Sequence, residues 1–155
     1  MRSIRIIAVG RLKTAHWKTA AEHYLTRLTR AFKVEETIIK DGNAALPPLE
    51  RNAQEGARIV AALTPADLAV CMDETGRQFT SQQFSAFLTP MWENANLRPC
   101  FIIGGAYGLS DEVRGKARHT MALSAMTFPH EMARVVLYEQ LYRADAILRG
   151  TPYHH

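Results

Sequence analysis

The stretch CFIIGGAYGLSDEV, residues 100–113, decides the fold prediction for this chain. Its first four residues are apolar and suit a buried strand, and the glycines that follow suit a tight loop. Ser110 is a favoured helix N-cap, and the acidic residues after it suit the first turn of a helix. The stretch therefore predicts a strand, a glycine loop and a helix in succession. Two interpretations of the loop stay open: a small-molecule site, or a turn that needs positive φ.

Outward from this stretch, strand and helix patterns alternate along the chain. One helical face carries Trp17, Ala20, Ala21, Tyr24, Leu25, Leu28 and Phe32 at the i, i+3, i+4, i+7 spacing. Thr80 and Gln83 form a capping box that begins a later helix, and residues 74–79 between it and the preceding strand are predicted to be a turn. The expected strands cover residues 4–10, 33–40, 67–73, 99–105 and 120–126, and the other helices cover 49–63, the segment after Ser110, and 130–149.

This alternation is typical of an α/β fold with a mostly parallel sheet and helices on both faces. We expect a single domain over residues 1–155. The net charge of +4 permits an anionic partner such as RNA without requiring one. Cys71 and Cys100 lie in predicted buried strands with no metal-ligand spacing, which indicates free thiols in a reducing compartment and no metal site. The apolar run at the N-terminus is too short for a membrane span or a signal peptide, so we expect a cytoplasmic protein.

Phosphate-binding motifs are absent where a nucleotide-binding fold would need them. The first strand ends in Gly10 followed by Arg11, without the GxGxxG fingerprint, and no GxxxxGK[ST] sequence occurs. In open parallel sheets ligands bind beyond the carboxyl ends of the strands. Two loops with unusual chemistry leave such ends, GGAYGLS and SAMTFPHEMAR.

The segment LSAMTFPHEMARVVLYEQLYRA, residues 123–144, carries the strongest functional signal. His130 and Arg134 lie on one side of the predicted helix, and Glu139 and Arg143 follow further along. A solvated face with salt bridges would account for them. However, Arg134 and Glu139 stand among apolar residues, where buried charges are costly without a purpose.

These segments, with IRIIAVGRLK, MDETGRQFTS and the terminal PYHH, resemble the RlmH (YbeA) family of SPOUT-class 23S rRNA pseudouridine methyltransferases over essentially the whole chain. The resemblance implies transfer of a methyl group from S-adenosylmethionine to N3 of a pseudouridine, on assembled ribosomes. It also implies a trefoil knot in the C-terminal half and a homodimer. Val135, Leu137 and Leu141 would supply the dimer contact. The rivals are a tRNA-directed member of the same knotted class and a binding module without turnover.

The resemblance also implies the site residues. The general base would be His130, His154 or Glu139, and Arg134 or Arg143 would stabilise the developing anion. Tyr153 would stack on a splayed base, and His155 stands where the family has Arg or Lys. The cofactor pocket would comprise Met72, Asp73, Ile103, Gly104, Gly105, Leu123, Ser124, Ala125, Met126, Thr127, Phe128 and Pro129.

Six of the basic residues in the first thirty positions have two open interpretations. They would either contact RNA phosphates, with a steep salt dependence, or form a solvated face. They are Arg5, Arg11, Lys13, Lys18, Arg27 and Arg30.

Overall fold

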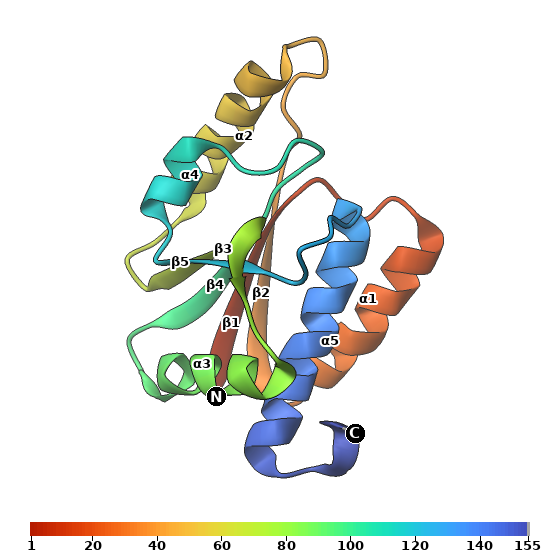
Figure 1. Ribbon diagram of the computed structural model, residues 1–155, viewed down its shortest axis with the longest axis vertical. Coiled ribbons are helices and arrows are strands. Elements are labelled where there is room, and N and C mark those ends of the chain that lie inside the picture. Colours follow the sequence, from red (N-terminus) through yellow and green to blue (C-terminus); the bar gives the residue numbers. More distant parts are fainter. Residues whose placement is uncertain (155) are drawn as a thin grey trace.

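Five parallel strands form one sheet in the order β2-β1-β4-β3-β5, with helices on both faces (Figure 1). This computed structural model describes residues 1–154, with His154 described by its backbone alone. The strands are β1 (Arg2–Val9), β2 (Phe32–Ile39), β3 (Asp67–Gln78), β4 (Arg98–Ile103) and β5 (His119–Ala122). The helices are α1 (Ala15–Leu28), α2 (Pro48–Ala62), α3 (Ser81–Glu93), α4 (Asp111–Lys116), α5 (His130–Arg149) and the 3-10 turn η1 (Pro152–His154).

The two faces of the sheet bury two separate apolar clusters. On β1, Ile4 and Ile6 point toward α1, α3 and α5, whereas Ile7 and Val9 point toward α2 and α4. This alternation follows from the period of two along a strand. The predicted α/β architecture is confirmed, and no described helix is long and apolar enough to cross a membrane.

The long helix α5 is the centre of the larger cluster. Leu137 and Leu141 are fully buried and Val135 nearly so, all within the core of this chain. The prediction that these three side chains supply a dimer contact is therefore wrong. The apolar face of α5 packs against α1, α3 and the sheet, so it does not need a partner chain.

The residues that begin or end three of the helices were predicted correctly. The capping box of Thr80 and Gln83 is present, the Ser110 side chain accepts from the Val113 N–H, and Gly150 ends α5 in the left-handed conformation with φ of 67°. Such residues satisfy the free backbone groups of a helix end within a few residues.

Most boundaries differ from prediction by one or two residues, and three differences are larger or change the element. The segment predicted as a turn after Asp73 continues β3, because Arg77 and Gln78 pair with β5 beyond a bulge. The fifth strand ends at Ala122 rather than reaching Met126. Phe32 starts β2 instead of extending the face of α1.

Arg5 is buried at the heart of an ion-pair network. Its guanidinium contacts the Asp67 carboxylate and the Ala62 carbonyl, and Arg98 Nε donates to the other Asp67 oxygen at 2.8 Å. Glu35 completes the network by pairing with both arginines. Arg5 is 6 % exposed, so neither interpretation of it, RNA contact or solvated face, is correct.

The Asp67→Asn variant should lower the free energy of unfolding by about 3 kcal/mol, since it leaves two arginines without their shared partner. Burial acts to raise the pKa of Asp67, but hydrogen bonds from Arg98, Thr64 and Arg5 outweigh it and lower the pKa. The stabilisation is therefore complete above the ordinary Asp pKa and is lost as the pH falls through the lower folded-state value.

Urea unfolding of the unsubstituted protein and of Asp67→Asn, from neutral to acidic pH, measures the difference in the free energy of unfolding. The difference between them should shrink on acidification, and the exposed-site variant Glu22→Gln should match the unsubstituted protein. Equal stability of Asp67→Asn at neutral pH would contradict the assignment.

Candidate active site

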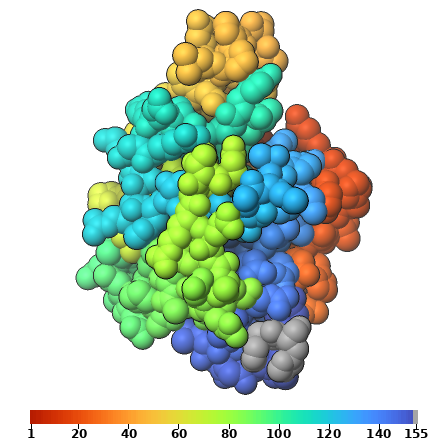
Figure 2. All heavy atoms as spheres, in the orientation of Figure 1, coloured from red at the N-terminus to blue at the C-terminus, as the bar shows by residue number. Residues whose placement is uncertain are grey.

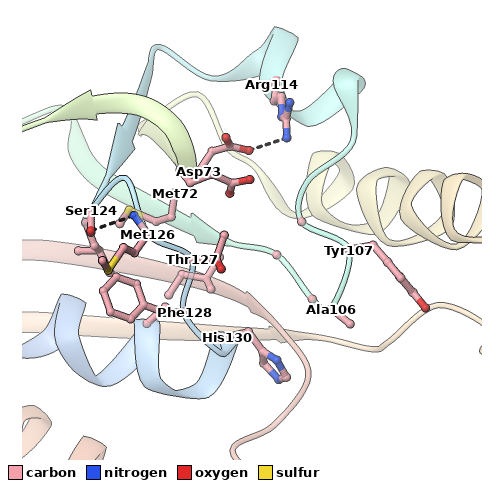
Figure 3. A pocket seen from close by; sticks show the side chains of 17 residues that line it. Met72, Asp73, Ala106, Tyr107, Arg114, Ser124, Met126, Thr127, Phe128 and His130 are labelled. Atoms are coloured by element: carbon pink, nitrogen blue, oxygen red, sulfur yellow. Dashed lines mark hydrogen bonds and ion pairs between the residues drawn. The ribbon is translucent and has the colours of Figure 1, made fainter.

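A cavity of about 400 Å³ opens at the carboxyl ends of β3, β4 and β5 (Figure 3). This volume is typical of small-molecule sites, and the position matches the rule for open parallel sheets. In Figure 2 the end of β3 and the β5–α5 loop lie beside one another on this face of the molecule. The lining residues are Met72, Asp73, Glu74, Ile103, Gly104, Gly105, Ala106, Tyr107, Gly108, Arg114, Leu123, Ser124, Met126, Thr127, Phe128, His130 and Ala133.

The glycine loop after β4 folds back closely on itself. A Cβ atom on Gly104 would lie 2.5 Å from the Gly108 carbonyl oxygen, which is too close for any side chain. The Gly108 N–H donates to the Gly105 carbonyl at 3.1 Å, and Gly108 has φ of 76°. Of the three loop glycines only Gly108 has positive φ, so the turn interpretation holds there and not at Gly104 and Gly105. The loop backbone also forms a wall of the cavity, as a small-molecule site would need.

Asp73 is the fixed charge of the cavity. Its carboxylate accepts from the Thr75 backbone N–H at 2.9 Å and from the Thr75 hydroxyl at 2.6 Å, and it pairs with Arg114 on α4. Burial acts to raise the pKa of Asp73, but the Thr75 hydrogen bonds and the Arg114 charge prevail and lower it. The site thus holds an ionised carboxylate whose charge is balanced by Arg114, which lines the same cavity.

Helix α2 supports the loop from behind. Asn52 Nδ2 donates to the Tyr107 carbonyl at 2.8 Å, and the buried Glu55 carboxyl lies against Gly105. Burial raises the pKa of Glu55, with the Arg51 guanidinium opposing. The carboxyl thus fills the space directly behind Gly105, where any added side chain would meet it.

The opposite wall is apolar and open to solvent. Met126 is 77 % exposed and Phe128 36 % exposed, although both side chains are large and apolar. The Ser124 hydroxyl accepts from the Met126 N–H at 3.0 Å, which fixes the turn that presents them. Exposed apolar side chains gathered at a cavity mark a surface that a ligand or partner covers.

The structure gathers most of the predicted cofactor residues around this cavity. Ten of the twelve line it, and Ala125 and Pro129 do not. Sequence reasoning missed Glu74, Ala106, Tyr107, Gly108 and Arg114. Arg114 reaches the site only because α4 packs beside it, and the sequence carries no local signal for that packing.

The predicted catalytic residues divide into separate groups. His130 lines the cavity from the first turn of α5, and its ring points away from the other labelled side chains in Figure 3, on the side of a second cavity that it also lines. Arg134 is buried, and its guanidinium donates to the Gly10 carbonyl at 3.3 Å and to the Tyr138 hydroxyl at 3.0 Å. It thus ties α5 to the loop after β1 and does not line the cavity.

Glu139, Arg143 and Tyr153 form a third group beside the C-terminal half of α5. Arg143 pairs with the Glu139 carboxylate, which also accepts from the Tyr153 hydroxyl at 3.3 Å. Burial and a hydrogen bond to Tyr24 raise the pKa of Tyr153 to about 12. The helix rise of about 1.5 Å per residue puts Glu139 well over 10 Å from His130. The His154 side chain lies outside the described residues.

A parallel sheet with helices on both faces and a glycine-walled cavity at the carboxyl ends of its strands is the arrangement of an α/β protein that binds a small molecule.

The family model described as "Predicted SPOUT methyltransferase" matches residues 1–154. The "Ribosomal RNA large subunit methyltransferase H" of Nitratidesulfovibrio vulgaris (strain DSM 19637 / Miyazaki F) is 61 % identical over all of both chains. The protein of that name from Bacteroides fragilis is 38 % identical over 97 % of each chain.

Solved structures agree on the fold. A probable methyltransferase from Bordetella pertussis Tohama I has a TM-score of 0.56 at 12 % identity, covering 92 % of this chain and 93 % of that one. The SpoU methyltransferase AviRb from Streptomyces viridochromogenes, in complex with the cofactor AdoMet, has a TM-score of 0.51 at 15 % identity, covering 93 % and 58 %. This chain belongs to the RlmH family of SPOUT methyltransferases.

The cavity suits S-adenosylmethionine, the methyl donor of these enzymes. The donor carries a sulfonium and an ammonium, and Asp73 with Glu74 supplies carboxylates on one wall. Met72, Met126 and Phe128 offer apolar surface for its adenine, and the glycine loop offers close backbone approach. The described residues contain no group of three or more His, Cys, Asp or Glu arranged to hold a metal.

The Gly104→Ala variant should weaken binding of S-adenosylhomocysteine by about tenfold or more, since the added methyl forces the loop apart. Isothermal titration measures the affinity. Gly115→Ala is the matched control, because its added Cβ would have no neighbour within 4 Å. Equal affinity of both variants would mean that the loop does not contact the cofactor.

Proposed function

We propose that this protein transfers the methyl group of S-adenosylmethionine to N3 of a pseudouridine in large-subunit rRNA, acting on assembled ribosomes in the cytoplasm as a single domain. The observation that carries the proposal is the 61 % identity, over the whole of both chains, to a ribosomal RNA large subunit methyltransferase H. The chemistry of the cavity supports it independently.

The bound donor supplies an activated methyl group on its sulfonium, so the protein mainly has to hold the acceptor in line and remove one proton. The N3–H of the base must be lost, and His130 is the candidate base that lines the cavity. Glu139, by contrast, is occupied by Arg143, Gln140 and Tyr153. Imidazole titrates near neutral pH and suits this role.

The other proposed site residues have supporting roles. The cofactor would contact the twelve residues from Met72 to Pro129 that the family resemblance implies, including Ala125 and Pro129 through the turn they share with Thr127 and Phe128. Arg134 would act as a positioning residue, because its bond to the Gly10 carbonyl links the start of α5 to the loop after β1.

A homodimer would give a role to Glu139, Arg143 and Tyr153. These residues, in the C-terminal half of α5 and in η1, lie too far from the cavity of their own chain to reach it. We infer that they serve the cavity of a second copy, together with the His154 side chain. The exposed Met126 and Phe128 would be covered in that arrangement. The trefoil knot implied by family membership belongs to the same proposal.

Transfer of a tritiated methyl group to ribosomes from a strain lacking this modification tests the function. Label mapped by mass spectrometry to one pseudouridine of the large subunit would support it. Label on bulk tRNA instead would favour a tRNA-directed enzyme, and tight cofactor binding without label on any RNA would favour a binding module.

The His130→Asn variant should lower kcat by about 100-fold or more, the typical contribution of a positioned base. Single-turnover methylation of ribosomes at saturating cofactor measures this rate. His23→Asn, at an exposed position of α1, is the control and should keep the rate of the unsubstituted enzyme. An unchanged rate in His130→Asn would exclude this residue as the base.

Deleting residues 153–155 should abolish methyl transfer while leaving cofactor affinity within a few fold, because Tyr153 does not line the cavity. Mixing the truncated chain with His130→Asn should restore activity, since one site of the mixed dimer then has both His130 and an intact tail. No restoration in co-expressed, purified mixed dimers would contradict a shared site.

A further inference from the structure

A second cavity, of about 350 Å³, adjoins the cofactor cavity along the same edge of the sheet. It lies beyond the carboxyl ends of β1 and β2, and the two cavities share Ala106 and His130. Whatever occupies the second cavity therefore lies next to His130, the proposed base.

The second cavity contains cations that the fold does not use. Arg11 and Lys13, in the loop after β1, are exposed, and their side chains form no hydrogen bond or ion pair with any described residue. In contrast, Arg5 and Arg134 on neighbouring elements are buried and fully engaged. Unpaired cations held on a short loop beside a cavity favour an anionic ligand.

Two carboxylates, of Glu131 and Asp41, also face this cavity, and they differ in whether their oxygens already accept hydrogen bonds. Both oxygens of Glu131 are occupied by α1, accepting from the Lys13 and Thr14 backbone N–H groups and from the Thr14 hydroxyl. The Thr14 hydroxyl and these backbone groups lower the pKa of Glu131, and its charge offsets the exposed N-terminus of α1. Asp41 has no such partner and can accept a hydrogen bond from a ribose hydroxyl.

An aromatic ring of the cofactor cavity lies close to the second cavity, next to Ala106, which both cavities share. Tyr107 is 53 % exposed, and its side chain points away from the other residues labelled in the cofactor cavity (Figure 3). The Arg51 guanidinium, which lines the second cavity, lies 5.8 Å from the centre of the Tyr107 ring. An exposed ring next to a guanidinium that lines the second cavity can stack on an unstacked base.

We propose, resting on the rRNA methyltransferase function above, that the second cavity binds the nucleotide next to the methylated one. Arg11 and Lys13 contact its phosphate, and Tyr107 stacks on its base. This contact holds the RNA strand so that the neighbouring pseudouridine lies at His130.

The Arg11→Gln/Lys13→Gln variant tests the proposal against Lys116→Gln/Arg118→Gln. The control pair has the same two residue types at the same spacing, both exposed, and lies where β5 begins, at the opposite edge of the sheet. Steady-state methylation of undermethylated ribosomes should show a KM for ribosomes raised about tenfold or more by the first pair, with kcat within about threefold. The slope of log affinity for ribosomes against log salt should fall by about two.

Tyr107→Ala should raise the same KM about tenfold, and Tyr107→Phe should restore it because stacking uses the ring face. Titration with S-adenosylhomocysteine should give unchanged affinity for the Arg11/Lys13 pair, which separates this site from the cofactor cavity. Equal KM values for the two charge pairs, with the unsubstituted enzyme active, would overturn the second site and leave the proposed function standing. An unsubstituted protein inactive on every RNA would overturn both.

Discussion

The parallel pairing of β4 between β1 and β3 is the constraint on which the site depends. Cys100, Phe101 and Ile102 are fully buried, and each pairs with residues of both neighbouring strands. This pairing fixes where β4 ends, and therefore where the Gly104 backbone meets Gly108. Because the ends of parallel strands share one edge, the same pairing brings the loops after β1, β3 and β5 around that point.

Burial of one cysteine on β3 and one on β4 makes both thiols unreactive. Burial raises the pKa of Cys71 to about 11 and that of Cys100 to about 12, so both thiols stay protonated at neutral pH. They are free, and they pack as small apolar groups under α2 and α4. Neither thiol therefore supplies a nucleophile or a metal ligand at neutral pH.

The fold was largely predictable from local patterns, and the failures share one physical cause. Helix α5 was predicted with its observed bounds because Pro129 and Gly150 act within the helix ends themselves. Residues 74–79 were predicted as a turn because glycine and charged residues usually mark one. Their strand conformation instead comes from pairing with Met121 and Ala122, more than forty residues away. A long-range ladder overrides local propensity, and a single sequence contains no signal for it.

The candidate site was predictable where residues follow a strand directly and unpredictable where they arrive by packing. Met72, Ile103 and Leu123 followed from the strand pattern together with the family resemblance. Arg114 and Tyr107 depend on how α4 and α2 pack against the β4 loop, through the Asp73 pair and the Asn52 hydrogen bond. The same limit applied to α5, whose apolar side chains can cover either a core or a partner.

The arginines show how the fold separates structural charge from functional charge. Arg5, Arg98 and Arg134 each meet a carboxylate from another strand, and removing a partner would leave a charge uncompensated in a region of low dielectric. These three arginines are poorly suited to bind a ligand, because the ligand would have to compete with an existing ion pair. Arg11 sits one residue after Gly10, whose carbonyl Arg134 holds. A buried arginine thus fixes the backbone of a loop whose own arginine remains free, which lowers the ordering cost when an anion binds there.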